Sequence, residues 1–327
     1  MGGVTQAGYV ERVIVVPRNG LANRLQAWAS AAALGTDIGA PVSCVWETET
    51  VVPATAEDLF TPSMSFMQAS ELTALLGAEH ASLPRYLTRR RDALVLAGHD
   101  CGEQMFMDEL ALVLARPSSP RHLVIIAGGS FHLPGSAEPI ERRREFYRSL
   151  AWSTAVTDRV RSASRDAKPY VALHVRQTDR SLEAPTARAV RGGLELLLRR
   201  RPERSLFIAA DTTAGRARWF QESAAMGFTP WSAPTPVLER TRVESTINAA
   251  VDWLLLASSS ATVHPLASTF SVEATVASGH PENAIELTAS PALQGWRTVT
   301  AWGKAAMTYP ARRLARATTS DGSGESD

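Results

Sequence analysis

The stretch KPYVALHVRQTDR, residues 168–180, decides how the rest of the chain is interpreted. Residues 170–175 form an apolar run with β-branched members, which predicts a buried strand. Arg176, Asp179 and Arg180 follow this run within a few positions. Because open α/β sheets bind ligands in the crevice outside the carboxyl ends of their strands, these side chains are expected at a binding site. A solvated turn in which Asp179 pairs with the arginines is the alternative.

Arg176 has the chemistry needed to bind a diphosphate. Its planar guanidinium presents a fork of donors that matches phosphate oxygens. Asp179 would hold that fork in place or accept a hydrogen bond from a sugar hydroxyl. The chain contains neither G-x-G-x-x-G nor G-K-[ST], so both a dinucleotide fingerprint and a P-loop are excluded.

Residues 174–180, HVRQTDR, resemble the H-x-R-R-x-D-[KR] signature of the α1,2-/α1,6-/protein O-fucosyltransferase superfamily, which includes the bacterial nodulation fucosyltransferases. Gln177 departs from this signature, because it replaces the second arginine of the usual pair. Residues 20–24, GLANR, resemble the last five positions of the N-terminal G-x-x-[GA]-N-[QR] loop of the same superfamily, which faces the cleft between two domains in relatives. A tight turn and an N-cap would explain Gly20 and Asn23 equally well.

Two further motifs of the superfamily have counterparts in the second half of the chain. The strand expected at Ser205–Ala210 ends at Asp211, which resembles [AT]-D-[DST] beside the nucleotide, although an N-cap also explains Asp211. Thr269, Phe270 and Ser271 resemble [ST]-x-F-S at a helix start. Free amides and small hydroxyls at such a start suit a diphosphate, and an ordinary cap is the alternative.

Asp252 lies in a strongly predicted helix, residues 241–257, roughly opposite its apolar stripe. Residues 253–256 are apolar on all sides, which indicates that this end of the helix is buried. A buried aspartate needs a partner. In relatives, an aspartate on the corresponding helix hydrogen-bonds the guanine base.

Length and composition narrow the class of protein. The chain has 327 residues, enough for two ordinary domains or one large one, and its formal net charge is +1. This balance provides no general attraction to nucleic acid or to anionic membranes. Cys44 and Cys101 are too few for a disulfide framework, and neither a signal peptide nor a membrane span is evident. A cytoplasmic protein is therefore expected.

The remaining pattern predicts alternating strands and helices. Arg12–Pro17 is expected to be a strand, followed by a helix that stops at Gly35. The run Arg142, Arg143 and Arg144 is expected to be a solvated face. Residues 296–317 are expected to be helical, with a break at Pro310, and residues 320–327 to be disordered.

Together the motifs imply an α/β fold of the GT-B type, with two Rossmann-like domains facing each other across a cleft. We expect an N-terminal, acceptor-side domain at residues 1–155, a nucleotide-sugar-binding domain at 156–300, and a C-terminal helix with a disordered tail at 301–327. No D-x-D occurs in the chain, which argues against a metal-dependent GT-A design, so no metal and no cofactor is expected.

The resemblance implies an inverting transfer of fucose from GDP-fucose to a hydroxyl of a small molecule or glycan. A transferase using another NDP-hexose, or a nucleotide-sugar-binding protein without catalysis, remains an alternative. The expected catalytic residues are Arg176, Asp179 and Glu183, although Glu183 lies one residue closer to the motif than the glutamate of some relatives; Glu47 and Glu49 are reserves. The donor is expected to contact Gly20, Asn23, His174, Arg176, Asp211, Asp252, Thr269, Phe270 and Ser271. Neither nucleic acid nor membrane is an expected partner, and the oligomeric state stays open.

Overall fold

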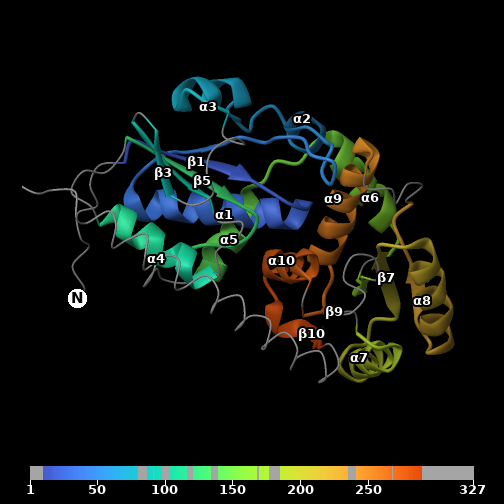
Figure 1. Ribbon diagram of the computed structural model, residues 1–327. Coiled ribbons are helices and arrows are strands. Elements are labelled where there is room, and N and C mark those ends of the chain that lie inside the picture. The colour runs from blue at the N-terminus through green and yellow to red at the C-terminus, as the bar shows by residue number, and fades with distance from the viewer. Residues whose placement is uncertain are drawn as a thin grey trace, which may run out of the picture.

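The computed structural model describes residues 10–79, 87–90, 92–97, 103–115, 121–133, 139–167, 169–176, 185–234, 241–266 and 268–288. These residues form two α/β units, each built on a five-stranded sheet (Figure 1). The helix and tail expected beyond residue 296 lie outside the described residues. None of the described helices combines the length and the apolar character needed to cross a lipid bilayer.

The first sheet has the strand order β2-β1-β5-β4-β3, and only the β3–β4 pair is antiparallel. Its strands are β1 (Arg12–Pro17), β2 (Val42–Cys44), β3 (Leu87–Arg90), β4 (Ala93–Ala97) and β5 (His122–Ala127). The helices of this half are α1 (Leu21–Ile38), α2 (Ala56–Leu59), α3 (Ala69–Leu76), α4 (Glu103–Leu114), α5 (Pro139–Ser149) and α6 (Thr154–Ser164). β1 is apolar along its length because both faces are covered: Val15 packs in the cluster around α1, and Val16 packs with Leu72 of α3.

The second sheet is parallel throughout, with the order β10-β9-β6-β7-β8. Its strands are β6 (Val171–Val175), β7 (Ser205–Ala210), β8 (Thr229–Trp231), β9 (Thr262–Pro265) and β10 (Ala284–Leu287). Its helices are α7 (Ala187–Arg200), α8 (Thr213–Ala225), α9 (Val243–Ala257) and α10 (Thr269–Ser278), with a 3₁₀ turn at Pro281–Asn283. Leu173 of β6 packs with Leu194 of α7, whereas Ala172 faces the cluster that contains α9. The central strand is therefore buried on both faces, as its sequence predicts.

One hydrophobic core continues from the first half into the second. Trp28 of α1 contacts Phe60 with ring centroids 5.5 Å apart, and Phe60 contacts Trp152 at 5.1 Å. Trp152 in turn lies 6.0 Å from Trp253 of α9. In Figure 1, α9 and α10 accordingly lie between the two sheets, next to α1 and α5. This shared core fixes the relative position of the two units, but no observation tests the boundary expected at residue 155.

The three arginines of α5 do not form a solvated face, so that expectation was wrong. Arg142 pairs with Asp37 of α1, Arg143 pairs with Glu273 of α10, and Arg144 donates to the backbone oxygen of Val276 at 3.2 Å. These side chains therefore contact groups of α1 and α10, where α5 packs against those helices. A charge run alone cannot reveal this, because the acidic partners are remote in sequence.

Glu273 of α10 connects the two halves through a fully buried carboxylate, with 0% of the residue exposed. Its Oε1 accepts a hydrogen bond from Gln26 Nε2 of α1 at 2.6 Å. Its Oε2 accepts from Tyr147 Oη at 2.6 Å and from Arg143 Nε at 3.1 Å, both on α5. The carboxylate is thus satisfied entirely by donors from the first half, which ties α10 to α1 and α5.

The first long helix also extends further than its sequence suggests. α1 continues through Gly35 to Ile38 and ends at Gly39, whose φ of 69° is the left-handed conformation that favours glycine. At Gly35 an added Cβ would lie 2.3 Å from Cγ2 of Val42. Gly35 therefore permits the close approach of α1 to β2 and does not end the helix.

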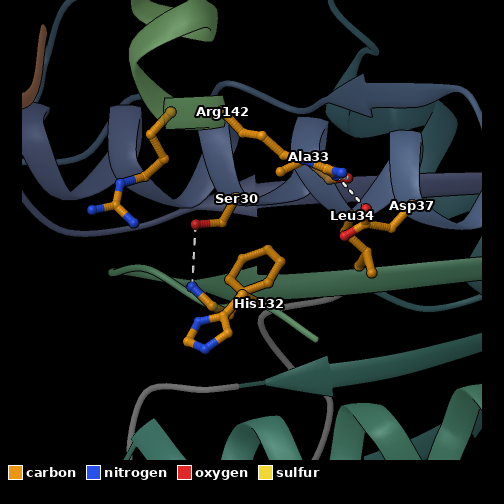
Figure 2. Close-up of a pocket in the computed structure, with 8 residues that line it drawn as sticks. Ser30, Ala33, Leu34, Asp37, His132 and Arg142 are labelled. Atoms are coloured by element: carbon orange, nitrogen blue, oxygen red, sulfur yellow. Dashed lines mark hydrogen bonds and ion pairs between the residues drawn. The ribbon is translucent and has the colours of Figure 1, made fainter. Parts of the chain in front are cut away.

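A small cavity beside α1 is too small to bind a substrate. It is lined by residues that include Ser30, Asp37, His132 and Arg142, and its volume is about 10 Å³ (Figure 2). That volume corresponds to at most one water molecule.

Candidate functional site

A cavity of about 510 Å³ lies between the two halves at the carboxyl ends of β6 and β7. After β6 the chain builds β7 and β8 on one side, and it then returns to build β9 and β10 on the other side. The order in which strands are added to the sheet thus reverses between β6 and β9, and such a switch point is where open α/β sheets bind ligands. A volume of this size is within the usual range for small-molecule sites.

The cavity brings together most of the side chains that the motifs single out. Arg176 and the start of α10 line the same cavity, so they face one gap as expected. From the expected donor contacts, the lining includes Gly20, Asn23, His174, Arg176, Asp211, Asp252, Thr269 and Phe270. Ser271 does not line the cavity but is fully buried and contacts His174. Asp179, Glu183 and Gln177 lie outside the described residues, so their placement stays a prediction.

His174 is held as a neutral imidazole at the end of β6. Its Nδ1 is 2.9 Å from Oγ of Ser271, and its ring lies 5.3 Å from the ring of Phe270. Burial, with smaller contributions from His264 and Arg176, lowers the pKa of His174 to about 3. His174 can therefore offer an anion a ring N–H donor but no positive charge at neutral pH.

The start of α10 keeps its amide groups available. Ser268 occupies the N-cap position, but its side chain makes no capping hydrogen bond. Its buried Oγ has no hydrogen-bond partner among the described residues. Ser268 therefore does not form the ordinary side-chain cap considered from the sequence. The N-terminus of α10, which is the positive end of the helix dipole, lies where Thr269 and Phe270 line the cavity.

Asp211 is not the N-cap of α8. That position belongs to Thr212, whose Oγ1 accepts a hydrogen bond from the amide of Gly215 at 3.0 Å. The N-cap alternative for Asp211 is thus wrong, and its position on the cavity wall stands without it.

α9 contributes a polar face that the sequence analysis recognised only in part. Asp252 was expected there, but Thr246 and Asn248 also line the cavity and are even more buried than Asp252. Burial raises the pKa of Asp252 to about 7, partly opposed by Arg216. The available signal for Asn248 was its spacing of four residues from Asp252, which places both on one face of the helix.

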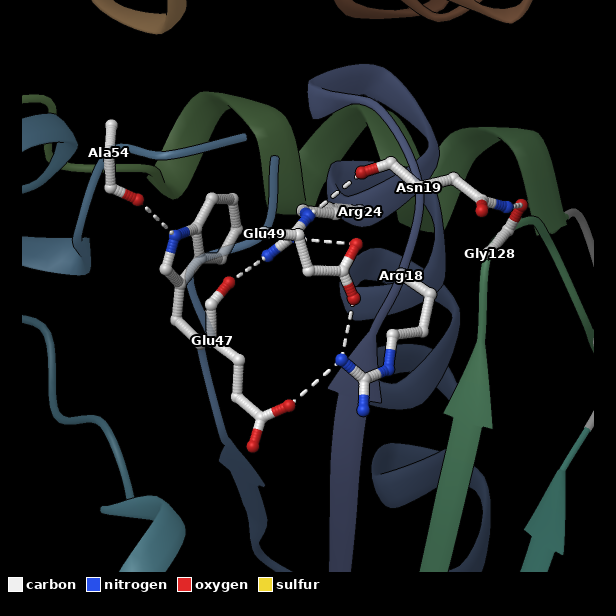
Figure 3. A network of polar contacts seen from close by, with 8 residues as sticks. Arg18, Asn19, Arg24, Glu47, Glu49, Ala54 and Gly128 are labelled. Atoms are coloured by element: carbon white, nitrogen blue, oxygen red, sulfur yellow. Dashed lines mark hydrogen bonds and ion pairs between the residues drawn. The ribbon is translucent and has the colours of Figure 1, made fainter. Parts of the chain in front are cut away.

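A buried arginine holds the N-terminal loop on the opposite wall. Arg24 of α1 is fully buried, donates from Nε to the backbone oxygen of Asn19 at 2.9 Å, and pairs with Glu49 at 3.1 Å (Figure 3). Its guanidinium also lies 5.2 Å from the ring centroid of Trp46. Asn19 has a φ of 70°, a conformation that is uncommon outside glycine, so these contacts fix the turn next to Gly20.

The same network involves both reserve bases. Arg18 contacts Glu47 at 2.8 Å and Glu49 at 2.5 Å (Figure 3). Neither glutamate belongs to the cavity lining, so their contacts favour a structural role. Among the described residues, no group of three or more His, Cys, Asp or Glu side chains is placed to hold a metal ion.

Asp252 should make the stability of the unliganded protein depend on pH. Its pKa rises from an ordinary value of 3.8 to about 7 on folding. A raised pKa contributes stability that is complete below about pH 4 and is lost as the pH rises through 7. Replacing Asp252 by asparagine should therefore remove a pH-dependent loss on the order of 1.4 kcal/mol for each pKa unit between the two values. Urea unfolding of both proteins at pH 5 and pH 8 measures this loss. If the unfolding free energies of the wild-type and Asp252→Asn proteins differ by the same amount at both pH values, the prediction is contradicted.

Comparisons with known proteins agree with this arrangement of sheets. No protein-family model matches the sequence. A search of curated proteins gives no match either. Solved structures do match: the fucosyltransferase NodZ from Bradyrhizobium is 15% identical, with a TM-score of 0.53 over 82% of this chain and 93% of that one.

Two other solved structures share the fold at similarly low sequence identity. Arabidopsis thaliana FUT1 in complex with GDP is 15% identical, with a TM-score of 0.59 over 83% of this chain and 69% of that one. POFUT1 in complex with GDP-fucose is 13% identical, with a TM-score of 0.53 over 85% of this chain and 97% of that one. These likenesses confirm the expected fold: the chain is built as a GT-B α/β protein of the kind found in fucosyltransferases.

Proposed function

We propose that the chain is a metal-independent, inverting glycosyltransferase that moves fucose from GDP-fucose to a hydroxyl of a small-molecule or glycan acceptor. The observation that carries this proposal is the single cavity into which Arg176, the start of α10 and the start of α1 at Gly20–Asn23 converge. Support comes from solved structures with the same fold, since NodZ soaked with GDP-fucose and POFUT1 in complex with GDP-fucose are among them.

In the proposed mechanism, the diphosphate binds at the carboxyl end of β6. Arg176 and the first amides of α10 would meet the charge that develops on the leaving group. His174, being neutral, would contribute a hydrogen bond and would not compete with Arg176 for the charge. Fixed donors of this kind supply the stabilisation that a bound cation provides in metal-dependent transferases.

The sugar would be transferred with inversion at its anomeric carbon. The bond to the diphosphate oxygen loosens first, which gives the sugar oxocarbenium character, and the acceptor oxygen then bonds to the opposite face. A carboxylate takes the proton of the acceptor hydroxyl. We assign this role to Glu183, with Asp179 orienting Arg176. The contacts of Glu47 and Glu49 with arginines make them weaker candidates.

The acceptor would enter beside the first half, opposite the diphosphate. There Leu21, Ala22, Val51 and Val52 contribute an apolar part of the lining. Gln177, in place of the second arginine of the motif, keeps another NDP-hexose as the alternative donor.

A nucleotide screen tests the choice of donor. We expect GDP to raise the melting temperature, because a ligand that binds only the native state stabilises it by about 2.7 kcal/mol at 100 times its Kd. Thermal shift and calorimetry with GDP, UDP and dTDP measure this effect. Binding of UDP or dTDP without binding of GDP would overturn the donor assignment. Release of GDP from GDP-fucose, compared with and without acceptor, then separates a transferase from an inactive binding protein.

A further inference from the structure

Two polar side chains of α9 lie next to each other on the cavity wall. Asn248 and Asp252 are four residues apart, so they are neighbours on one face of the helix. Both line the cavity, and their residues are only 5% and 9% exposed. A carboxylate and a carboxamide are thus presented side by side to any ligand at this end.

The orientation of the Asn248 amide is fixed by a neighbour outside the cavity lining. Nη1 of Arg159, on α6, donates to Oδ1 of Asn248 at 3.0 Å. A guanidinium has only donors, so the atom that faces it must be the amide oxygen. Arg159 also pairs with Glu244, one turn earlier on α9, which restrains the guanidinium.

The other end of the amide is left for a ligand. Nδ2 of Asn248 is buried and has no hydrogen-bond partner among the described residues. A buried donor without a partner costs about 1–3 kcal/mol, which an acceptor atom of a bound ligand would offset. The wall therefore offers one donor, Nδ2, beside a pair of acceptor oxygens on Asp252.

We propose that Asn248 is a specificity-determining residue that donates from Nδ2 to O6 of the guanine base, next to Asp252, which would accept from N1–H and N2–H as the family resemblance implies. This inference rests on the proposed function and adds a second residue that recognises the base of its donor. Guanine presents one acceptor followed by two donors along this edge, which complements the wall. Adenine would place its 6-amine against Nδ2. Uracil would place its O2 against a carboxylate oxygen, so both bases meet repulsive pairs.

Arg159 acts through Asn248 and is therefore a positioning residue. If the guanidinium of Arg159 is removed, the Asn248 amide can turn over and present its oxygen to O6. The preference for an O6 acceptor is then lost, although no side chain that contacts the nucleotide has been removed. Arg161 on the same helix is a matched control, because its ion pair with Asp158 is exposed and remote from Asn248.

Calorimetry with three nucleotides tests the assignment: GDP, 6-thio-GDP and IDP. 6-thio-GDP keeps N1–H and N2–H but replaces O6 by a weaker acceptor, and IDP lacks only the 2-amine. The wild-type protein should bind 6-thio-GDP about tenfold more weakly than GDP, the effect of one buried hydrogen bond. Asn248→Ala should abolish this preference and keep the preference of GDP over IDP. Arg159→Met should reduce the preference for GDP over 6-thio-GDP, whereas Arg161→Met should not.

The outcomes separate this inference from the proposed function. Equal wild-type affinities for GDP and 6-thio-GDP would overturn the role of Asn248 and leave the GDP-dependent function intact; this comparison needs no folded variant. If a folded Asn248→Ala protein still prefers GDP over 6-thio-GDP, the proposed role of Asn248 is also overturned. No binding of GDP to the wild-type protein would overturn both the inference and the donor assignment.

Discussion

Replacing Arg176 by alanine is expected to lower the rate of GDP release from GDP-fucose by about 10²- to 10³-fold, the usual effect of removing one donor that stabilises developing charge. Arg176 directly follows β6 and lines the cavity together with the start of α10. In the proposed reaction, negative charge accumulates on the diphosphate as the bond to the sugar breaks. A guanidinium placed at that point lowers the energy of the transition state more than that of the bound donor. The rate is measured with saturating GDP-fucose.

Two further variants show whether the loss belongs to this guanidinium. Arg176→Lys keeps the charge but not the planar fork, so it should recover only part of the rate. Arg218→Ala removes an arginine of α8 that pairs with Glu222 at the surface, and it should have the wild-type rate. A folded Arg176→Ala protein with an unchanged rate would remove Arg176 from the mechanism.

Replacing Glu273 by alanine should destabilise the protein by about 3–5 kcal/mol, the usual effect of breaking a buried ion pair from one side. The variant leaves the side chains of Gln26, Arg143 and Tyr147 without their shared acceptor. Arg143 would then carry a charge that is largely shielded from water between α5 and α10, since only 13% of its side chain is exposed. The midpoint of urea unfolding measures the loss.

Glu222 provides the matched control for Glu273. It is also a helical glutamate paired with two arginines, Arg191 and Arg218, but these arginine side chains are about half exposed. Water and salt screen such pairs, so Glu222→Ala should cost less than about 1 kcal/mol. Similar losses in both variants would show that Glu273 does not hold the two halves together.

Much of the fold can be predicted from the sequence because burial leaves a direct local pattern. β1 and β7 were expected at their observed bounds, since strands covered on both faces are continuous apolar runs. The sequence was least informative over residues 78–120, where β3, β4 and α4 lie, because short strands near a sheet edge leave weaker patterns.

The candidate site divides in the same way. Arg176, Asp211 and Thr269 lie directly at strand ends or a helix start, so their positions follow from local sequence and from the geometry of parallel sheets. The contact of Arg159 with Asn248 could not be predicted, because these residues are remote in sequence and meet only when α6 packs on α9.

The sequence by itself determined the strands, the helix starts and the residue types that meet at their ends, because these depend on short-range periodicity and local chemistry. Only the tertiary structure decided which charges are buried and with whom they pair. Arg143 resembled a surface residue in the sequence, yet it meets Glu273 across the junction of the two halves. The physical reason is that the energy of a charge depends on its surroundings, and those surroundings come from distant segments of the chain.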